Sequence, residues 1–591
     1  MRLFRLAFGA AAALVAFEAA PGEASAQSPV PPGARPGIEP ALRNPVELNR
    51  PQPAPRLSPA LEAPPLQPQT GPGAVAEIAV GAVRITGAAA VPPAALAPAI
   101  AGLAETTIPL ARIEEARLGI LRAYRDAGYP FAAVNAGVTP RGGTPPVADL
   151  NFAVTEGFVA EVKLEGDIGP AGTQVLRFLN RLIGQRPVSS AAIERALLLA
   201  QDIPGLTVRG TLRPLANEPG ALLLVAQVER KSYSGYVNLD NRGYRLVGPW
   251  QGLLVAGLNS FTEYGERTEF SLFGAQDSTQ WFAQSSVDAF VGGSGLKVRL
   301  YAGTGETRPS GSLRQIGYYG ATQVAGVSAN YPVIRSRPVN LYAVGSLDVF
   351  DGVVETGTSG RVRASRDAIR TARFGFDGQL LESWVRFLPA ATNIATLRVA
   401  RGIDALGATR NGYALSGRSG AENFGFVKVS GEVQRTQPLW SPGEGQLFSL
   451  QGLFAGQWSD DILPQAEKFY LGGNRLGRGY YAGQVTGDRA WGLALELQYD
   501  IGLDLPWNLG FGSNRLAAQF YAFRDISRAV ENRSNDANRR LSSWGGGVRT
   551  VLSERVQLDL EAVHREVRRP DGAAADALHE TALLFRTLVR F

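Results

Sequence analysis

Short segments in which apolar and polar side chains alternate fill the chain from Tyr233 to its last residue, Phe591. In the clearest segment, residues 493–501, leucine, tyrosine and isoleucine alternate with alanine, glutamate, glutamine and aspartate. Residues 341–349 and 556–562 repeat the pattern. Alternation with a period of two is typical of strands that have one apolar face and one wet face. Helical periodicity nearly vanishes here, so the sequence predicts a large sheet.

Such strands span a membrane only as a closed barrel, because closure pairs the backbone N–H and C=O groups in the bilayer. The composition favours this fold, with 69 glycines, 9% aromatic residues and only 19% charged residues. Past the N-terminus, no run of about 18 apolar residues indicates a spanning helix. Residues 231–591 are therefore predicted to form a transmembrane antiparallel β-barrel. At about 22 residues per strand and connection, roughly 16 strands fit, and about 14 or 18 are also compatible.

The last segment is an amphipathic strand that stops at an aromatic residue. One face of it consists of Leu583, Phe585, Thr587, Val589 and Phe591. This arrangement resembles the assembly signal of bacterial outer-membrane barrels, which implies that the barrel assembly machinery reads Phe585, Val589 and Phe591. The alternative is a strand that happens to end in phenylalanine.

Residues 1–26 have the pattern of a secretory signal peptide, with two arginines before an apolar stretch that is too short to span a bilayer. Ala24 and Ala26 fit an A-x-A cleavage site, so Gln27 is predicted to begin the mature chain. Residues 27–74 contain proline every few positions, which predicts an extended or disordered linker. Residues 39–49 could form a short helix, but Pro40 and Pro45 interrupt it. The chain is therefore expected to leave the cytoplasm.

Few residues suited to catalysis are present. The chain has no cysteine and only two histidines, His564 and His579, neither beside a nucleophile pattern. This excludes thiol chemistry and argues against an enzyme, a cofactor or a metal centre. The net charge is +6, but the basic residues are scattered and form no patch of the kind that nucleic-acid-binding proteins show. We therefore expect no nucleic acid partner.

Two small mixed units are predicted before the barrel, over residues 75–157 and 158–230. The first is predicted as a strand, two helices and two strands, over residues 76–86, 93–103, 110–126, 131–138 and 148–154. The second repeats this order over residues 159–164, 173–182, 189–199, 206–212 and 221–228. Ser189 or Ser190 fits the N-cap of the second unit's second helix. Taken alone, this order predicts two small α/β domains without a defined role.

Local motifs in these units resemble a known family. The first unit contains Gly128, Tyr129 and Pro130 and closes with Glu156 and Gly157. This is similar to the first POTRA (polypeptide-transport-associated) domain of two-partner secretion transporters, the hemolysin-activator and filamentous-hemagglutinin transporter family. The resemblance implies a signal peptide, a linker, two POTRA domains in the periplasm and a barrel of about 16 strands in the outer membrane.

Two barrel motifs extend the resemblance. Asp240, Asn241 and Gly243 are similar to the family's first-strand motif. A loop around residues 471–487 resembles the family's inward-folding loop, and its motif consists of Gly472, Gly473, Arg478, Gly479 and Tyr480.

The resemblance implies that the loop arginine pairs with an aspartate on the barrel wall. Phe523 and Asp525 match that wall motif, so Arg478 and Asp525 are expected to be partners. Two positions depart from the family pattern: Gly477 replaces an aliphatic residue, and Ser527 replaces a glycine. The alternative for the loop motif is an ordinary surface loop.

The resemblance implies a translocator that recognises an unfolded exoprotein through its POTRA domains and secretes it through the barrel. The resemblance implies that the cargo is a large β-helical hemolysin or adhesin. It also allows for activation of the cargo during export. The expected partners also comprise outer-membrane lipid, and a closed single-chain barrel is expected to be a monomer. One alternative is an assembly insertase of the same superfamily. Another is a passive porin or receptor, which has no need of the two small units.

Overall fold

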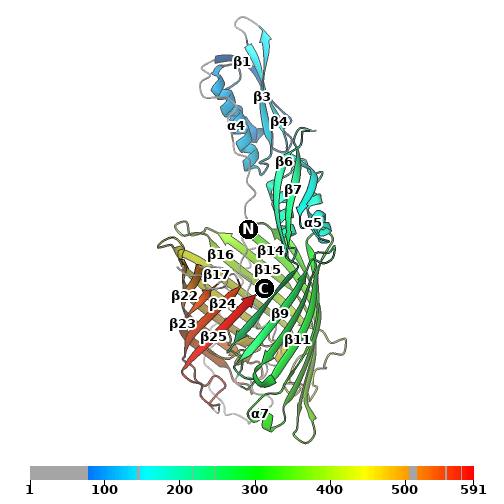
Figure 1. Ribbon diagram of the computed structural model, residues 1–591, viewed down its shortest axis with the longest axis vertical. Coiled ribbons are helices and arrows are strands. Elements are labelled where there is room, and N and C mark those ends of the chain that lie inside the picture. Colours follow the sequence, from blue (N-terminus) through cyan, green and yellow to red (C-terminus); the bar gives the residue numbers. More distant parts are fainter. Residues whose placement is uncertain are drawn as a thin grey trace.

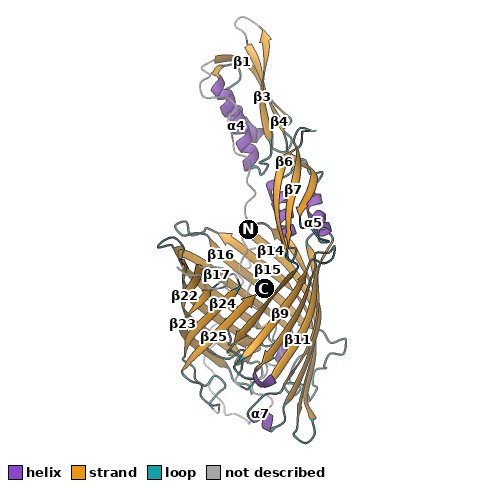
Figure 2. Cartoon of the chain, viewed as in Figure 1, coloured by secondary structure: helices purple, strands orange, loops and turns teal. Residues whose placement is uncertain are grey.

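The computed structural model describes residues 77–142, 147–216, 218–244, 246–504, 515–552, 555–573 and 575–591. The predicted signal peptide, with Ala24, Ala26 and Gln27, and the predicted linker lie outside these residues. The described chain forms a stalk of two small units on one rim of a large barrel (Figure 1). Helix is concentrated in the stalk and strand in the barrel (Figure 2). None of the described helices is long and apolar enough to cross a membrane.

The first small unit packs two helices against a four-stranded sheet with the order β2-β1-β4-β3. Its elements are β1 (Glu77–Thr86), α3 (Pro93–Ile100), β2 (Thr107–Pro109), α4 (Leu110–Asp126), β3 (Ala133–Gly142) and β4 (Val147–Thr155). Along α4, Ile113, Ala116, Ile120 and Tyr124 recur with the helical period and are buried. The predicted order lacked β2. Three residues are too few to show a period, and β2 forms because it pairs with the start of β1.

The second small unit has a three-stranded sheet with the order β5-β7-β6. Its elements are β5 (Phe158–Gly166), α5 (Gly172–Leu179), α6 (Ser190–Gln201), β6 (Leu206–Pro214) and β7 (Ala221–Arg230). The predicted first helix is shorter than expected, since residues Asn180–Leu182 form a 3-10 turn. Ser189 is the N-cap of α6, because its hydroxyl accepts a hydrogen bond from the backbone N–H of Ala192 at 3.2 Å.

Sixteen of the described strands close the barrel, and every neighbouring pair is antiparallel. They are β8 (Tyr233–Asp240), β9 (Gln251–Asn259), β10 (Arg267–Ala275), β11 (Gln280–Val291), β12 (Leu296–Thr307), β13 (Tyr319–Arg335), β14 (Val339–Thr356), β15 (Val362–Glu382), β16 (Ala391–Gly402), β17 (Val427–Trp440), β18 (Gln446–Trp458), β21 (Arg489–Asp504), β22 (Arg515–Val530), β23 (Arg539–Val551), β24 (Val556–Arg565) and β25 (Thr581–Arg590). The last strand pairs with the first, β25 with β8. The predicted fold class is thereby confirmed, and of the strand numbers left open the chain has 16.

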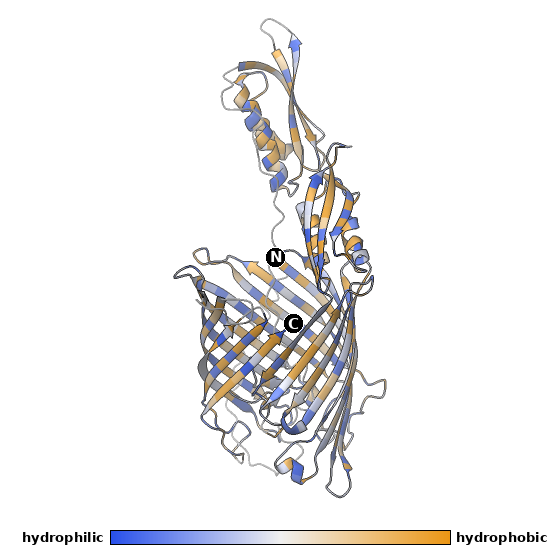
Figure 3. Ribbon diagram, in the orientation of Figure 1, coloured by the Kyte–Doolittle hydropathy of each residue, from blue (hydrophilic) through white to orange (hydrophobic). Residues whose placement is uncertain are grey.

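The two faces of the wall differ as the alternation predicted. On β21, Leu495 and Leu497 are 45% and 46% exposed, whereas Glu496 and Gln498 between them are buried. Figure 3 shows the resulting mixture of apolar and polar positions along each strand. Apolar side chains therefore face the lipid and polar ones face the lumen.

Tryptophans mark the two ends of the barrel. All seven tryptophans in the described part of the chain are exposed: Trp250, Trp281, Trp384, Trp440, Trp458, Trp491 and Trp544. Trp440 and Trp458 are the last residues of the antiparallel neighbours β17 and β18, so they lie at opposite rims. Such a distribution fits aromatic girdles at the two membrane interfaces.

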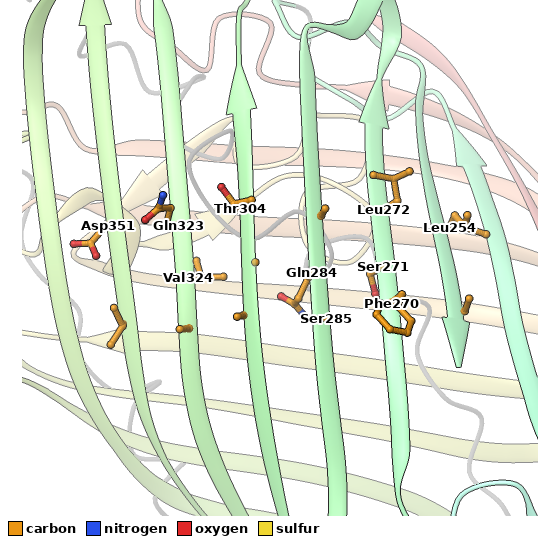
Figure 4. Close-up of a pocket in the computed structure, with 16 residues that line it drawn as sticks. Leu254, Phe270, Ser271, Leu272, Gln284, Ser285, Thr304, Gln323, Val324 and Asp351 are labelled. Carbon is orange, nitrogen blue, oxygen red and sulfur yellow. The ribbon is translucent and has the colours of Figure 1, made fainter. Parts of the chain in front are cut away.

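A hollow of about 780 Å³ lies on the wall between β9 and β14 (Figure 4). Small side chains such as Ala283, Ser285 and Ala302 line it. Phe270 and Leu272 also line it and are 53% and 52% exposed, in alternation with buried residues of β10. The hollow therefore opens mainly toward the lipid.

Contacts with the barrel rim hold the second small unit in place. The Phe178 ring on α5 meets the Phe290 ring on β11 edge to face, with centroids 5.3 Å apart. Arg335, at the end of β13, donates two hydrogen bonds of 2.8 Å to the carboxylate of Asp202, at the end of α6. These contacts fix the base of the stalk on the turns at one end of the barrel wall.

Candidate functional site

The loop between β18 and β21 turns back into the barrel. Its two arms form a short ladder, β19 (Phe469–Leu471) with β20 (Val485–Gly487). Tyr480, near the loop tip, is only 2% exposed. Small side chains on the inner wall leave room for the loop and pack against it: Ala455, Ala490, Ala494 and Ala529. We call residues 459–488 the inward loop.

Arg478 of the inward loop contacts Asp525 of β22 through both backbone and side chain. Its backbone N–H donates to Asp525 at 2.8 Å, and Nε and Nη2 donate to the two carboxylate oxygens at 3.1 and 2.8 Å. Arg478 is 4% exposed and Asp525 is fully buried. A bidentate, charge-assisted contact of this kind fixes position and orientation together. The structure thus brings these two predicted site residues together.

A second carboxylate, that of Glu496, also binds Arg478, and the sequence analysis did not predict it. We call Arg478, Asp525 and Glu496 the arginine site. Glu496 on β21 binds Nη1 of Arg478 and also binds Arg549 of β23, at 2.6 Å. The loop cation is therefore part of a chain of alternating charges on the inner wall. Glu496 lies on the polar face of its strand, so its inward direction was predictable, but its partner was not.

Aromatic side chains surround the arginine site. The guanidinium of Arg478 lies 3.6 Å from the centroid of the Phe523 ring, within cation–π distance. The hydroxyl of Tyr480 donates to the carbonyl of Ser542 at 2.8 Å and accepts from the backbone N–H of Val567 at 3.0 Å. Tyr480 therefore ties the tip to strand β23 and to the connection after β24.

Glycines let the loop approach the wall closely. Gly479 has a φ of +89°, and a Cβ there would lie 2.4 Å from a methyl group of Val563. Gly472 has a φ of +101°, and a Cβ there would lie 2.2 Å from the carbonyl of Tyr481. Gly473, beside it, donates its N–H to the carbonyl of Tyr480 at 3.0 Å.

The two residues that depart from the family pattern, Gly477 and Ser527, both fit the places they occupy in the structure. Gly477 has a φ of +72°, which glycine adopts without the strain that a side chain adds. Ser527 is 1% exposed on the inner face of β22. Neither departure removes a charge from the arginine site.

The first-strand motif lies at the seam that closes the barrel, apart from the arginine site. The carboxylate of Asp240 accepts from the backbone N–H of Arg242 at 2.9 Å. The side chain of Asn241 donates to the carbonyl of Leu583 at 3.1 Å and accepts from the N–H of Phe585 at 2.8 Å. These bonds extend the pairing of β8 with the last strand.

The last residues complete the same seam. Phe591 and Gly235 exchange two backbone hydrogen bonds of 3.0 Å. A Cβ on Gly235 would lie 2.5 Å from the Phe591 ring, so this glycine makes room for the ring. Phe591 and Val589 are 52% and 37% exposed toward the lipid side. In the turn after β8, Gly243 donates its N–H to the carbonyl of Pro249 at 2.9 Å.

The stalk motif has two parts. Glu156 accepts hydrogen bonds from the N–H groups of Ala89 and Ala90, at 2.9 and 2.8 Å, and from the hydroxyl of Tyr124, at 2.8 Å. Burial raises the pKa of Glu156, but the hydrogen bonds from Ala90, Tyr124 and Ala89 outweigh it and hold that pKa below its ordinary value. Glu156 therefore fastens the loop after β1 to helix α4.

The remaining motif residues join the two small units. The carbonyl of Gly128 accepts from the N–H of Ser190, and the carbonyl of Gly157 accepts from the N–H of Val188, each at 2.9 Å. Tyr129 packs against the first unit's core, and Pro130 follows it in a turn. The predicted site residues thus form three separate groups: the arginine site, the seam and the stalk. In the described part of the chain, no three acidic or histidine side chains are placed to hold a metal ion.

The chain is similar to known proteins along most of its length. The family described as haemolysin secretion/activation protein ShlB/FhaC/HecB matches residues 220–550. The hemolysin transporter protein ShlB of Serratia marcescens is 24% identical over 489 residues, which cover 82% of this chain and 81% of that protein. The heme/hemopexin transporter protein HuxB of Haemophilus influenzae is 21% identical over 414 residues, or 67% and 69% of the two chains. The solved structure of CdiB from Escherichia coli has the same fold, with a TM-score of 0.66 at 16% identity over 91% of this chain and 94% of that one.

Proposed function

The chain belongs to the haemolysin secretion/activation family of outer-membrane transporters, and we propose that its stalk captures an unfolded exoprotein which then leaves through the barrel. The barrel lies in the outer membrane, and the two POTRA-like units lie in the periplasm. We place these units at residues 75–157 and 158–230, after a signal peptide and a linker, and the barrel at residues 231–591.

The capture step rests on an open sheet edge. Strand β3 pairs with β4 on one side, and of its ten residues only Val134 is buried. It lies in the unit farther from the barrel (Figure 1). An unfolded chain can add to such an edge as a further strand, because the main chain supplies hydrogen bonds whatever the cargo sequence. This edge is the observation that carries the proposal.

The transport step rests on the inward loop. The arginine site fastens the loop to the inner wall, so the loop acts as an internal gate. The sequence contains no G-x-x-x-x-G-K-[ST] nucleotide-binding loop. Folding of the cargo outside the cell therefore supplies the driving force in this proposal.

The cargo class follows from the relatives. Their names describe transporters of hemolysin and of heme/hemopexin. We infer a large β-helical exoprotein of the hemolysin or adhesin type, moved by a monomeric barrel that the barrel assembly machinery inserts through the seam residues Phe585, Val589 and Phe591.

Site-specific photo-crosslinking tests the capture step. A photoreactive residue at Ala136 or Thr139, on the β3 edge, is expected to crosslink a candidate exoprotein of the hemolysin or adhesin type that is co-expressed with the chain. The same residue at Arg122, an exposed position on α4, serves as the matched control. Equal crosslinking at all three positions, or none at the β3 edge while export proceeds, would show that the edge does not receive the cargo.

A further inference from the structure

A second group of buried charges, apart from the arginine site, binds the stem of the inward loop, by which we mean residues 465–471. Glu467 ends a 3-10 turn, Gln465–Glu467, just before β19, and is 5% exposed. Its carboxylate binds the guanidinium of Arg373 on β15 at 2.5 Å and the ammonium of Lys428 on β17 at 2.8 Å. Thr371, also on β15, donates to it at 3.3 Å. The stem of the loop is therefore tied to strands that the arginine site does not include.

The backbone at this position is held as well. The carbonyl of Glu467 accepts from Lys428 at 2.6 Å and from Gln457 of β18 at 3.1 Å. Side chain and main chain of one residue thus share a cationic partner. This double contact resembles the one between Arg478 and Asp525, where backbone and side chain also meet a single wall residue.

The two anchors carry opposite charges. At the tip, the loop supplies the cation, and β21 and β22 supply the carboxylates of Glu496 and Asp525. At the stem, the loop supplies the anion, and β15 and β17 supply the cations. Both wall sectors bury charges that need the loop for full compensation. Departure of the loop exposes unpaired charges of both signs on the lumen wall.

The anchors differ in what remains when the loop leaves. Arg373 also binds Asp348 on β14, and Lys428 also donates to Gln457 at 3.1 Å. Asp525 is fully buried, and within the described residues Arg478 is its cation. Release of the stem leaves Arg373 with Asp348 and Lys428 with the neutral amide of Gln457. Release of the tip leaves the Asp525 carboxylate without its cation and also breaks the two hydrogen bonds of Tyr480, so release of the tip is costlier.

We propose that Glu467 is a positioning residue of the transporter, a second anchor that holds the stem of the inward loop and releases before Arg478. This inference rests on the proposed role of the loop as a gate. It assigns the gate an order of opening: the contacts of Glu467 with Arg373 and Lys428 break first, and those of Arg478 with Asp525 and Glu496 break second.

Hydrogen exchange on the purified full chain without cargo tests the proposal. Glu467→Gln keeps the side chain's size and removes its charge. We expect exchange of the stem amides, residues 465–471, to accelerate about tenfold or more, as for loss of a buried charge-assisted contact. The backbone amide of Arg478 should stay protected. Because no cargo is present, this result does not depend on whether the exported substrate has been identified correctly.

The controls separate a local anchor from a general loss of stability. Glu306→Gln removes a carboxylate whose pair with Arg308 lies at the surface, with 30% and 59% of the two side chains exposed, and should change no loop amide. Glu467→Asp keeps the charge and should restore much of the protection. If Glu467→Gln fails to assemble, Lys428→Gln removes the partner instead and should loosen the same amides. Unchanged stem exchange in the assembled variants, or equal loosening of stem and tip, would overturn the proposal.

Discussion

Asp525 accepts the backbone N–H of Arg478 as well as its guanidinium, so a single wall carboxylate fixes both the path of the inward loop and the direction of its arginine. The backbone bond does not depend on the side chain at position 478. A substitution there weakens the anchor without removing every contact between loop and wall.

Arg478→Ala should loosen the tip of the loop more than Arg478→Lys. Alanine leaves Asp525 buried without its cation, at a cost of about 3–5 kcal/mol. Lysine restores a charge but cannot form the two-pronged contact. Hydrogen exchange of residues 476–481 should rank the chains as wild type, then lysine, then alanine, in order of increasing rate. Equal exchange rates in the two variants would show that a positive charge at position 478 does not by itself hold the tip of the loop.

A disulfide between loop and wall should stop transport. A Cβ at Gly477 would lie 3.5 Å from the Cβ of Leu541, which is within the separation of a disulfide, although the positive φ of +72° strains any side chain at this position. The chain contains no cysteine, so Gly477→Cys with Leu541→Cys introduces the sole pair. The oxidised pair is expected to block export, and reduction should restore it, with each single variant as control. Undiminished export by the oxidised pair would mean that the loop tip stays in place during transport.

Glu156→Ala should destabilise the first POTRA-like unit by about 2–3 kcal/mol, because three hydrogen bonds to one carboxylate are lost. The pKa of Glu156 is held below its ordinary value, so its contribution is present above about pH 4.5 and is lost as the pH falls through the lowered value. The temperature of thermal unfolding of the stalk should therefore fall below about pH 4.5 in the wild type, and it should depend less on pH in the variant. Identical pH profiles would exclude Glu156 as the titrating group.

The outer loops should loosen as the pH rises past neutrality. Glu531, after β22, binds Lys468 at 2.7 Å and Arg418 at 3.1 Å. Burial raises the pKa of Glu531 to about 7. The charge of Asp488 also raises this pKa, whereas the charges of Lys468 and Arg418 lower it. A raised pKa means that its contribution to stability is lost as the pH rises through about 7. Hydrogen exchange of residues 531–538, corrected for the pH dependence of exchange in an unstructured peptide, should be faster at about pH 8 than at about pH 6. Glu531→Gln should abolish the difference, and its persistence in that variant would refute the assignment.

Sequence reasoning reached the architecture because period-two alternation and a closing aromatic strand are local signals. It could not decide the strand number, since connections vary: the one from Gly402 to Val427 is long, whereas others are tight turns. The pairing of Arg478 with Asp525 was predicted only because both lie in recognisable motifs. Glu467 and Arg373 lie in no motif and are distant in sequence, so only the closed barrel brings them together.

Export of a co-expressed candidate exoprotein of the hemolysin or adhesin type tests the central claim most directly. The exoprotein is expressed with wild-type transporter, with Arg478→Ala at matched outer-membrane levels, and without transporter, and cargo outside the cell is quantified. We predict export with wild type, a marked loss with Arg478→Ala and none without the transporter. Absence of export with wild type, together with altered levels of other outer-membrane barrels when the gene is deleted, would contradict the account and indicate an assembly insertase instead.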